Sequence, residues 1–133
     1  MTDTQIASLH TDTVSDAEII QRGWETVGRG DWDVLIKDYT DDVNFVMPGQ
    51  NDVLESKVAL RDMLDSLGSA LPPGFNMTSI RQVGDNDEVV SLIEWTSDKV
   101  PQGSQLAVLF RLSNSKIYEE RWFIDTEQWK AAF

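Results

Sequence analysis

The strongest constraint on the fold is a hairpin pattern over residues 104–125, close to the end of the chain. From 106 to 112 every second residue is apolar, and 117–124 is rich in aromatic and β-branched residues. A polar Ser-Asn-Ser sequence at 113–115 separates the two halves. Period-two alternation around a polar turn predicts two antiparallel strands joined by a tight connection.

The length of this turn decides which side chains of the second strand share a face with Phe110. A three-residue turn places the even-numbered residues on that face, namely Tyr118, Glu120, Trp122 and Ile124. A two-residue turn places the odd-numbered residues there instead, namely Glu119, Arg121 and Phe123. A slip of one residue inverts every side chain of a strand, so the residues alone leave both arrangements open.

Three helices are predicted upstream of the hairpin. The first begins at a capping box at 15–18, continues with one apolar stripe, and ends at Gly-Arg-Gly 28–30. A shorter helix follows over 31–39 and is broken by an Asp-Asp pair at 41–42. A serine caps the third helix, which runs over 56–70.

The remaining segments alternate as strands do. We predict a short strand at 43–47, further strands at 75–83 and 89–96, and a last short helix at 126–133. Helices that precede a run of antiparallel strands indicate an α+β fold. A four-strand meander that curls around an amphipathic helix leaves a cone, and its mouth is a natural pocket for a small ligand.

Composition limits the domain organisation and the cellular location that we expect. We expect a flexible tail at 1–14 and one domain at 15–133, since 133 residues suffice for a single core. The sequence has no cysteine, no secretory signal and no apolar run of the roughly 18 residues that a membrane helix needs. We therefore expect a cytoplasmic protein without disulfides or thiolate chemistry.

The net charge of −12 comes from 11 basic and 23 acidic residues. Nucleic acid and anionic membranes are poor partners for such a chain, because phosphate groups demand a basic patch. No group of Asp, Glu and His has the spacing of metal ligands. We predict neither a metal nor a cofactor.

Three segments carry a resemblance to a known superfamily: IIQRGWETVGRGDWDVLIKDYTDDVNFVMPG at 19–49, ALRDML at 59–64 and VLFRLSNSKIYEERWFID at 108–125. In this order they resemble the nuclear transport factor 2 superfamily, which includes SnoaL-like polyketide cyclases, ketosteroid isomerases and limonene-epoxide hydrolases. The resemblance covers about residues 15–130. It implies a cystatin-like α+β cone, in which a curved mixed or antiparallel sheet wraps around three N-terminal helices. It also implies an apolar pocket and a homodimer formed through the sheet.

The catalytic groups of two relatives are missing at the matching positions. The base, the two oxyanion groups and the supporting tyrosine of ketosteroid isomerases correspond to Met47, Gly23, Val108 and Leu64. Without a base or oxyanion donors that proton-transfer mechanism cannot operate. The working acids and arginine of limonene-epoxide hydrolases correspond to Trp122 and to positions near Trp95 and Ser97.

Three residues remain as catalytic candidates. Asp125 matches the terminal aspartate of the SnoaL-like cyclases, although Gln128 three residues later favours a helix cap instead. Both family comparisons favour Trp122, and hence Glu120, pointing into the cone, where burial would raise the pKa of the carboxyl. Tyr39 falls where the family has an aromatic residue facing the cavity. Its hydroxyl is expected either to donate a hydrogen bond to a ligand or to be buried with a backbone partner.

Two functions follow as hypotheses. The first is a small-molecule-binding cone for a neutral hydrophobic compound, with acid/base catalysis of cyclase, isomerase or hydrolase type. The second is a non-catalytic dimeric binding or assembly module whose cone is filled by its own side chains. For the first, we expect the ligand to contact Trp24, Tyr39, Phe45, Met47, Leu64, Trp95, Val108, Phe110, Glu120 and Trp122.

Overall fold

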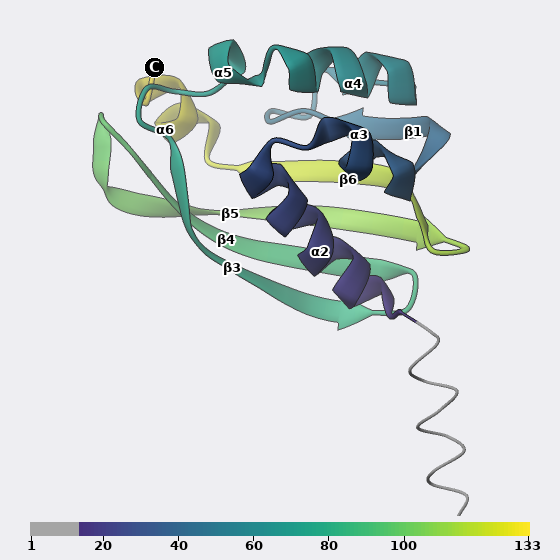
Figure 1. The fold of residues 1–133 in the computed structure, drawn as a ribbon. Coiled ribbons are helices and arrows are strands. Elements are labelled where there is room, and N and C mark those ends of the chain that lie inside the picture. Colours follow the sequence, from purple (N-terminus) through teal and green to yellow (C-terminus); the bar gives the residue numbers. More distant parts are fainter. Residues whose placement is uncertain (1–13) are drawn as a thin grey trace, which may run out of the picture.

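The computed structural model describes residues 14–133, so nearly all of the tail expected at 1–14 lies outside the described residues. Figure 1 shows the N-terminal helices gathered on one side of a curved sheet. In chain order the elements are α2 (Asp16–Arg29), α3 (Trp32–Leu35), η1 (Ile36–Asp38), β1 (Tyr39–Val46), β2 (Val53–Leu54), α4 (Lys57–Asp65), α5 (Leu67–Ala70), β3 (Asn76–Asp85), β4 (Glu88–Ser97), β5 (Val100–Ser113), β6 (Lys116–Ile124) and α6 (Thr126–Ala131).

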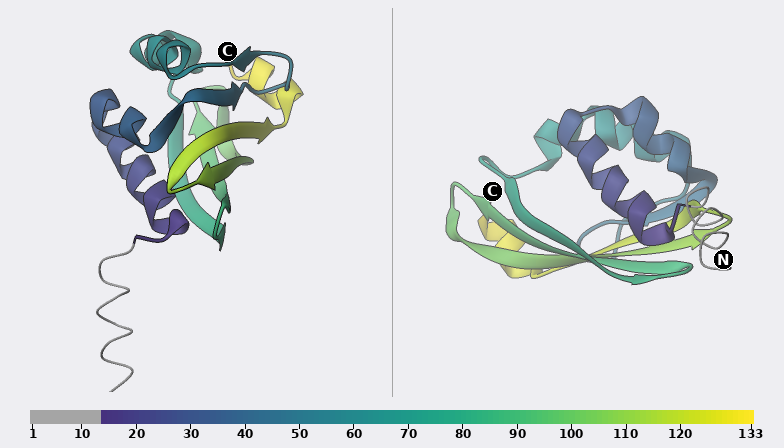
Figure 2. Two further views of the ribbon diagram at one scale, coloured as in Figure 1. Left: turned by 90° about the vertical axis from the view of Figure 1, so that its right-hand side faces the viewer. Right: turned by 60° about the horizontal axis from the view of Figure 1, so that its bottom comes forward.

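The six strands form one sheet in the order β2-β1-β6-β5-β4-β3. Neighbouring strands are antiparallel except β1 and β6, which pair in parallel. The sheet curves so that α2 lies across its concave face (Figure 2). This arrangement confirms the predicted α+β cone with a mixed sheet and N-terminal helices. The parallel pair was not predicted, because β1 and β6 are far apart in the sequence.

Local signals place the ends of the long helix as predicted. The Ser15 side chain accepts a hydrogen bond from the backbone N–H of Glu18, which satisfies one free donor of the first turn. Gly30 ends α2 with a φ of 67°, a left-handed conformation that glycine adopts without steric cost. These caps fix where α2 begins and ends over the sheet.

Two predicted helices end earlier than expected. The second stops at Leu35 and continues only as the short η1, because Tyr39 already belongs to β1, as do the two aspartates expected to break the helix. The third divides at Ser66 into α4 and α5. In the first case pairing with β6 outweighs the local helix signal, as tertiary context commonly does.

The hairpin contains a two-residue turn together with a β-bulge. Asn114 and Ser115 have φ values of 52° and 65°, and Ser113 pairs with Lys116. Leu112 then pairs with Ile117 but Arg111 pairs with Glu119, so Tyr118 is the extra residue of a bulge.

This bulge corrects both sequence-based alternatives. The turn has two residues, yet the bulge restores the register expected of the longer turn, in which Phe110 faces Glu120 and Val108 faces Trp122. The expectation that a two-residue turn directs Glu119, Arg121 and Phe123 inward was therefore wrong. The three-residue turn also predicted Tyr118 on the face of Phe110, and this was wrong, because the bulge leaves Tyr118 exposed.

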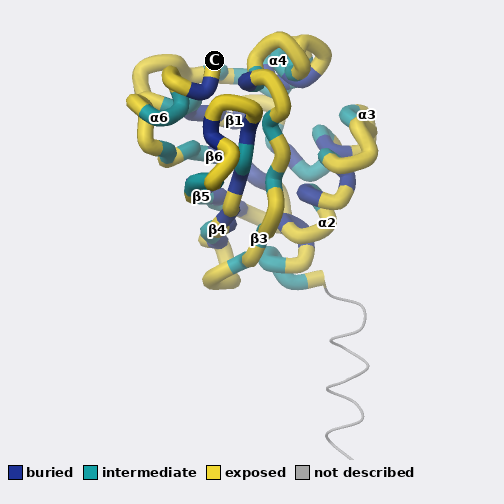
Figure 3. Tube along the Cα trace, turned by 90° about the vertical axis from the view of Figure 1, so that its left-hand side faces the viewer, coloured by how far each residue is buried: buried dark blue, intermediate teal, exposed yellow. Residues whose placement is uncertain are grey.

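The core lies between the concave face and the helices. Strand β1 is buried at Tyr39, Val43, Phe45 and Val46, whereas the edge strand β3 is mostly exposed and has no buried residue (Figure 3). At one end of the cone, Trp129 of α6 packs edge-on against Phe75 and Trp95 with ring centroids 5.6 and 5.7 Å away. This aromatic cluster covers the end of the sheet at which α6 lies.

The positive φ angles of the turn predict a stabilising substitution. Ser115→Gly should raise the free energy of unfolding by about 1 kcal/mol, since only glycine adopts this conformation without strain. Urea denaturation measures the change. Ser113→Gly is the matched control at the end of β5, and it should lower stability slightly. Equal effects of the two substitutions would contradict the turn geometry.

Candidate functional site

Glu120 lies on β6 with its side chain on the concave face, opposite Phe110 of β5. Only 4% of the residue is exposed. The prediction that Glu120 is buried inside the cone is therefore confirmed. Its inward direction follows from the bulge at Tyr118, because without the extra residue the neighbouring Glu119 would take this place.

Both carboxylate oxygens of Glu120 accept a hydrogen bond from an aromatic side chain. The Tyr39 hydroxyl donates to Oε1 at 2.5 Å, and the Trp122 indole Nε1–H donates to Oε2 at 2.8 Å. Tyr39 reaches Glu120 because β1 runs parallel to β6, with Tyr39 beside Ile117. The parallel pairing thus brings together two residues that are 81 positions apart.

Burial dominates the electrostatics of this pair. It raises the pKa of Glu120 from 4.5 to about 7, although the hydrogen bonds from Tyr39 and Trp122 favour the carboxylate. Burial, and then the nearby negative charge of Glu120, raises the pKa of Tyr39 well above its usual range. Glu120 can therefore hold or release a proton near neutral pH, while Tyr39 stays a hydroxyl donor.

Glu120 and Tyr39 open onto a cavity of about 90 Å³ between the sheet and the helices. Its wall is almost entirely apolar. Of the residues predicted to contact a ligand, seven line the cavity: Trp24, Tyr39, Phe45, Leu64, Phe110, Glu120 and Trp122. The helices add Ile19, Ile20, Leu60, Met63 and Leu67, which the sequence showed only as apolar stripes.

The other three predicted contacts lie outside this lining. Val108 is fully buried on β5, where it pairs with Trp122 of β6. Trp95 is fully buried in the aromatic cluster around Trp129, and its indole nitrogen has no hydrogen-bond partner among the described residues. Met47 follows β1, where its backbone N–H donates to the Asp52 carbonyl at 2.8 Å.

Asp125 is separate from the Glu120–Tyr39 pair. It caps α6, because its side chain accepts a hydrogen bond from the Gln128 backbone N–H at 3.0 Å. The prediction of a helix cap is confirmed. The same capping interaction accounts for the aspartate without any catalytic role.

Sequence reasoning missed two polar groups near the cavity. Ser91, fully buried on β4, accepts a hydrogen bond from Nε1 of Trp24 at 2.8 Å and so fixes that indole against the cavity. Asp38 of η1 lines the cavity and forms an ion pair with Arg22 at 3.8 Å. Ser91 could have been found as the polar residue on the inward face of an alternating strand.

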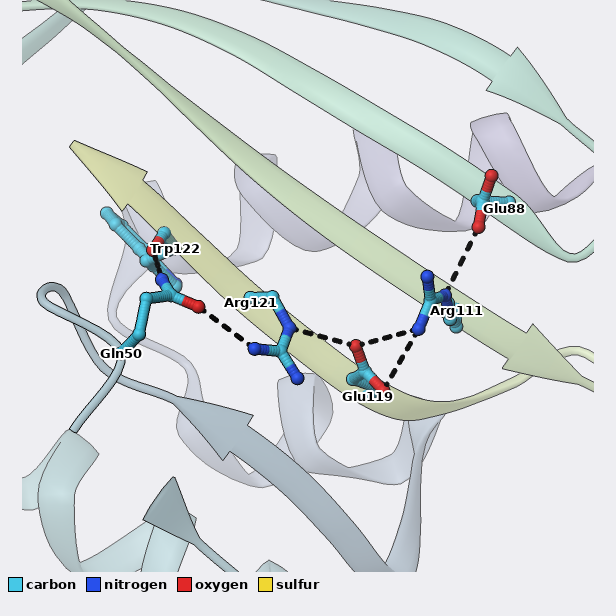
Figure 4. A network of polar contacts seen from close by, with 6 residues as sticks. All are labelled: Gln50, Glu88, Arg111, Glu119, Arg121 and Trp122. Carbon is cyan, nitrogen blue, oxygen red and sulfur yellow. Dashed lines mark hydrogen bonds and ion pairs between the residues drawn. The ribbon is translucent and has the colours of Figure 1, made fainter. Parts of the chain in front are cut away.

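A network on the convex face keeps the residues that flank Glu120 turned outward (Figure 4). Arg111 contacts both Glu88 and Glu119, at 3.1 and 3.2 Å. Arg121 binds Glu119 at 3.2 Å and also donates to the side chain of Gln50 at 2.9 Å. Gln50 in turn donates to the Trp122 carbonyl oxygen. Because both neighbours of Glu120 are held on the outside, Glu120 itself is held on the inside.

No helix in residues 14–133 combines the length and the apolar character needed to cross a membrane. Within the same residues, no three His, Cys, Asp or Glu side chains lie close enough together to hold a metal ion.

The fold is that of a nuclear transport factor 2-like α+β cone. A protein from Xanthomonas campestris pv. campestris, named as a candidate polyketide cyclase, is similar with a TM-score of 0.70 and 15% identity over 88% of this chain and 95% of its own. A nuclear transport factor 2-like protein from Burkholderia xenovorans LB400 also has a TM-score of 0.70, with 17% identity over 88% and 94%. A de novo designed protein with a curved β-sheet reaches 0.64, with 16% identity over 88% and 90%.

The sequence itself gives the narrower assignment. The family model of the SnoaL-like domain matches residues 20–120, and the chain belongs to this family. A search of curated proteins finds no significant match. Since the structural neighbours share so few identical residues, they establish the fold, and the role of the cavity must be argued from its own residues.

The raised pKa of Glu120 predicts a specific loss of stability with rising pH. Below pH 4.5, the ordinary pKa of the carboxyl, Glu120 is protonated in both the folded and the unfolded state, and stability is at its full value. As the pH rises through the folded-state pKa of about 7, the folded state must give up the proton or hold a buried charge, and the free energy of unfolding falls. The difference corresponds to about 3 kcal/mol in the free energy of unfolding. Urea denaturation between about pH 4.5 and about pH 8 measures it.

The decline must be assigned to Glu120 by comparison, since a net charge of −12 adds its own repulsion. Glu120→Gln should lack this component, and its stability should change less over the same range. Glu25→Gln, on the exposed side of α2, is the control that removes one carboxylate and keeps the wild-type slope. Parallel curves for wild type and Glu120→Gln would contradict the assignment.

Proposed function

We propose that the chain is a small-molecule-binding domain whose cavity accepts one small hydrophobic compound. The observation that carries this proposal is a buried carboxyl group, Glu120, placed at the wall of an otherwise apolar cavity. Burial of an ionisable group without a cation lowers stability. Its presence at a cavity is what binding or catalytic sites typically show.

The chemistry available to this site is acid/base chemistry without a cofactor. With its pKa near 7, Glu120 can donate a proton as a carboxylic acid or accept one as a carboxylate. The Tyr39 hydroxyl, 2.5 Å away, would stabilise the ionised form and orient the carboxyl group. This pair supports a cyclase, isomerase or hydrolase reaction in which one proton moves at the ligand.

A non-catalytic module is the second function that a specific observation favours. The cavity of about 90 Å³ is smaller than the apolar cavities of about 150 Å³ that bind benzene. Side chains from α2 and α4 occupy much of the cone. In this case the domain would act through its surface, and Glu120 would contribute only to the packing of the core.

We also propose that two copies associate through the convex face of the sheet. Leu92, Ala107 and Phe123 are cross-strand neighbours in one row on that face. Leu92 is 39% exposed and Phe123 is 46% exposed, which is unusual for large apolar side chains in the middle of a sheet. A second copy with the same row would bury both.

Dimerisation makes a direct prediction. Sedimentation at micromolar concentration should show a dimer, and Leu92→Lys should shift it toward the monomer by burying an unpaired charge. Val58→Lys, at a residue that is 72% exposed on α4, is the control and should leave the dimer intact. A wild-type monomer throughout this range would contradict the proposal.

The two glycines of α2 provide a test of the cavity itself. Gly23 lines the cavity, and an added Cβ would lie 3.7 Å from Leu35 Cδ1, which is an ordinary contact. Gly28 on the same helix has no atom within 4 Å of such a Cβ. Both Gly23→Ala and Gly28→Ala should therefore stabilise the helix by about 1 kcal/mol.

Only Gly23→Ala should change ligand binding, because only this methyl group enters the cavity. The measurement is native mass spectrometry of the purified protein for a retained compound, followed by NMR titration with small hydrophobic fragments on the indole N–H signals. We expect weaker binding in Gly23→Ala and unchanged binding in Gly28→Ala. If no fragment shifts the signals of Trp24 or Trp122 in the wild type, the binding function fails and the module is favoured.

A further inference from the structure

Glu120 differs from the other carboxyl group at the cavity because it has no cationic partner among residues 14–133. Asp38 also lines the cavity, but Arg22 of α2 lies 3.8 Å from it. The groups that contact Glu120 are the neutral Tyr39 and Trp122, and no lysine, arginine or histidine lines the cavity. The cavity therefore contains one carboxyl group whose charge nothing in the described chain compensates.

The aromatic residues around this carboxyl form a wall suited to a cation. Trp24 and Trp122 meet edge-on with centroids 6.1 Å apart, and Phe110 lies 6.0 Å from Trp24. The ring centroid of Phe45 lies 6.4 Å from that of Trp122. Aromatic faces attract ammonium groups, and the attraction is larger where water is excluded.

We propose that the ligand of this cavity is a small hydrophobic amine, bound as its ammonium form against the Glu120 carboxylate. The inference rests on the proposed binding function of the same cavity and names the chemical class of its ligand. A compound that enters as the neutral free base takes the proton of Glu120: the O–H bond breaks and an N–H bond forms. A compound that enters already protonated gives the same complex, and the proton of Glu120 leaves to water.

The same features select against other ligands. A carboxylate ligand would meet Glu120 and Asp38 without a basic residue on the lining to receive it. A neutral alcohol can donate one hydrogen bond to Glu120, but it leaves the buried charge uncompensated. Because the cavity of about 90 Å³ is smaller than a cavity of about 150 Å³ that binds benzene, the amine is expected to be smaller than benzene, with about four non-hydrogen atoms.

Three probes of matched size test the proposal: isopropylamine, 2-propanol and acetate. NMR titration at about pH 8, where the Glu120 carboxyl with its pKa of about 7 is mostly ionised, follows the indole N–H signals of Trp24 and Trp122. The amine should bind about tenfold or more tightly than the alcohol, and the carboxylate should bind least. Equal or tighter binding of the alcohol would overturn the proposal.

Glu120→Gln separates binding in the cavity from binding to surface acids. The variant should lose the preference for the amine and bind the alcohol as well as the wild type does. Glu25→Gln removes an exposed carboxylate from α2 and should keep the preference. An amine preference that survives in Glu120→Gln would overturn the proposal, even if the fold and the stability of the variant are unchanged.

The experiment also distinguishes this inference from the function on which it rests. If the alcohol shifts the Trp24 and Trp122 signals but the amine does not, the cavity binds small molecules and the ligand class is wrong. If none of the three probes shifts those signals, both the ligand class and the proposed binding function fail.

Discussion

The single extra residue in β6 is the constraint on which the site depends. Ser113 and Lys116 close a two-residue turn, and with continuous pairing from there Glu119 would face the cone. The bulge at Tyr118 moves the register by one and turns Glu120 inward. The ion pairs of Glu119 and Arg121 on the convex face then hold this register, because a slip would bury both charges.

The inward carboxyl makes the core less stable than an apolar residue would. Two hydrogen bonds, from Tyr39 and Trp122, satisfy one acceptor position on each oxygen but supply no positive charge. Burial therefore dominates, and the carboxyl holds its proton up to about pH 7. A buried polar group that lowers stability, and that nevertheless receives two side-chain hydrogen bonds, is typical of a functional site. A role in packing alone would be served at least as well by leucine or methionine.

Much of the fold could be predicted from the sequence, because its signals are local. The cap at Ser15, the left-handed Gly30 and the alternation of β5 each act within a few residues, and all three appear as predicted. The start of β1 at Tyr39 and the short β2 could not be predicted, since they depend on pairing with distant strands. The direction of Glu120 required knowledge of a bulge, which no residue type at 117–119 specifies.

The partners of Glu120 illustrate the same limit. Tyr39 was expected at the cavity on the basis of family resemblance, but the sequence gives no indication that its hydroxyl reaches a carboxyl 81 positions away. Gly23 is the complementary case: by resemblance it corresponds to one oxyanion group of the ketosteroid isomerases, and in the structure it lines the cavity. A hydrogen atom at this position supplies no hydrogen-bond donor and takes up little space at the wall of the cone. A missing catalytic group of those relatives is therefore compatible with a cavity beside Glu120, and the absence of their chemistry does not argue against a ligand here.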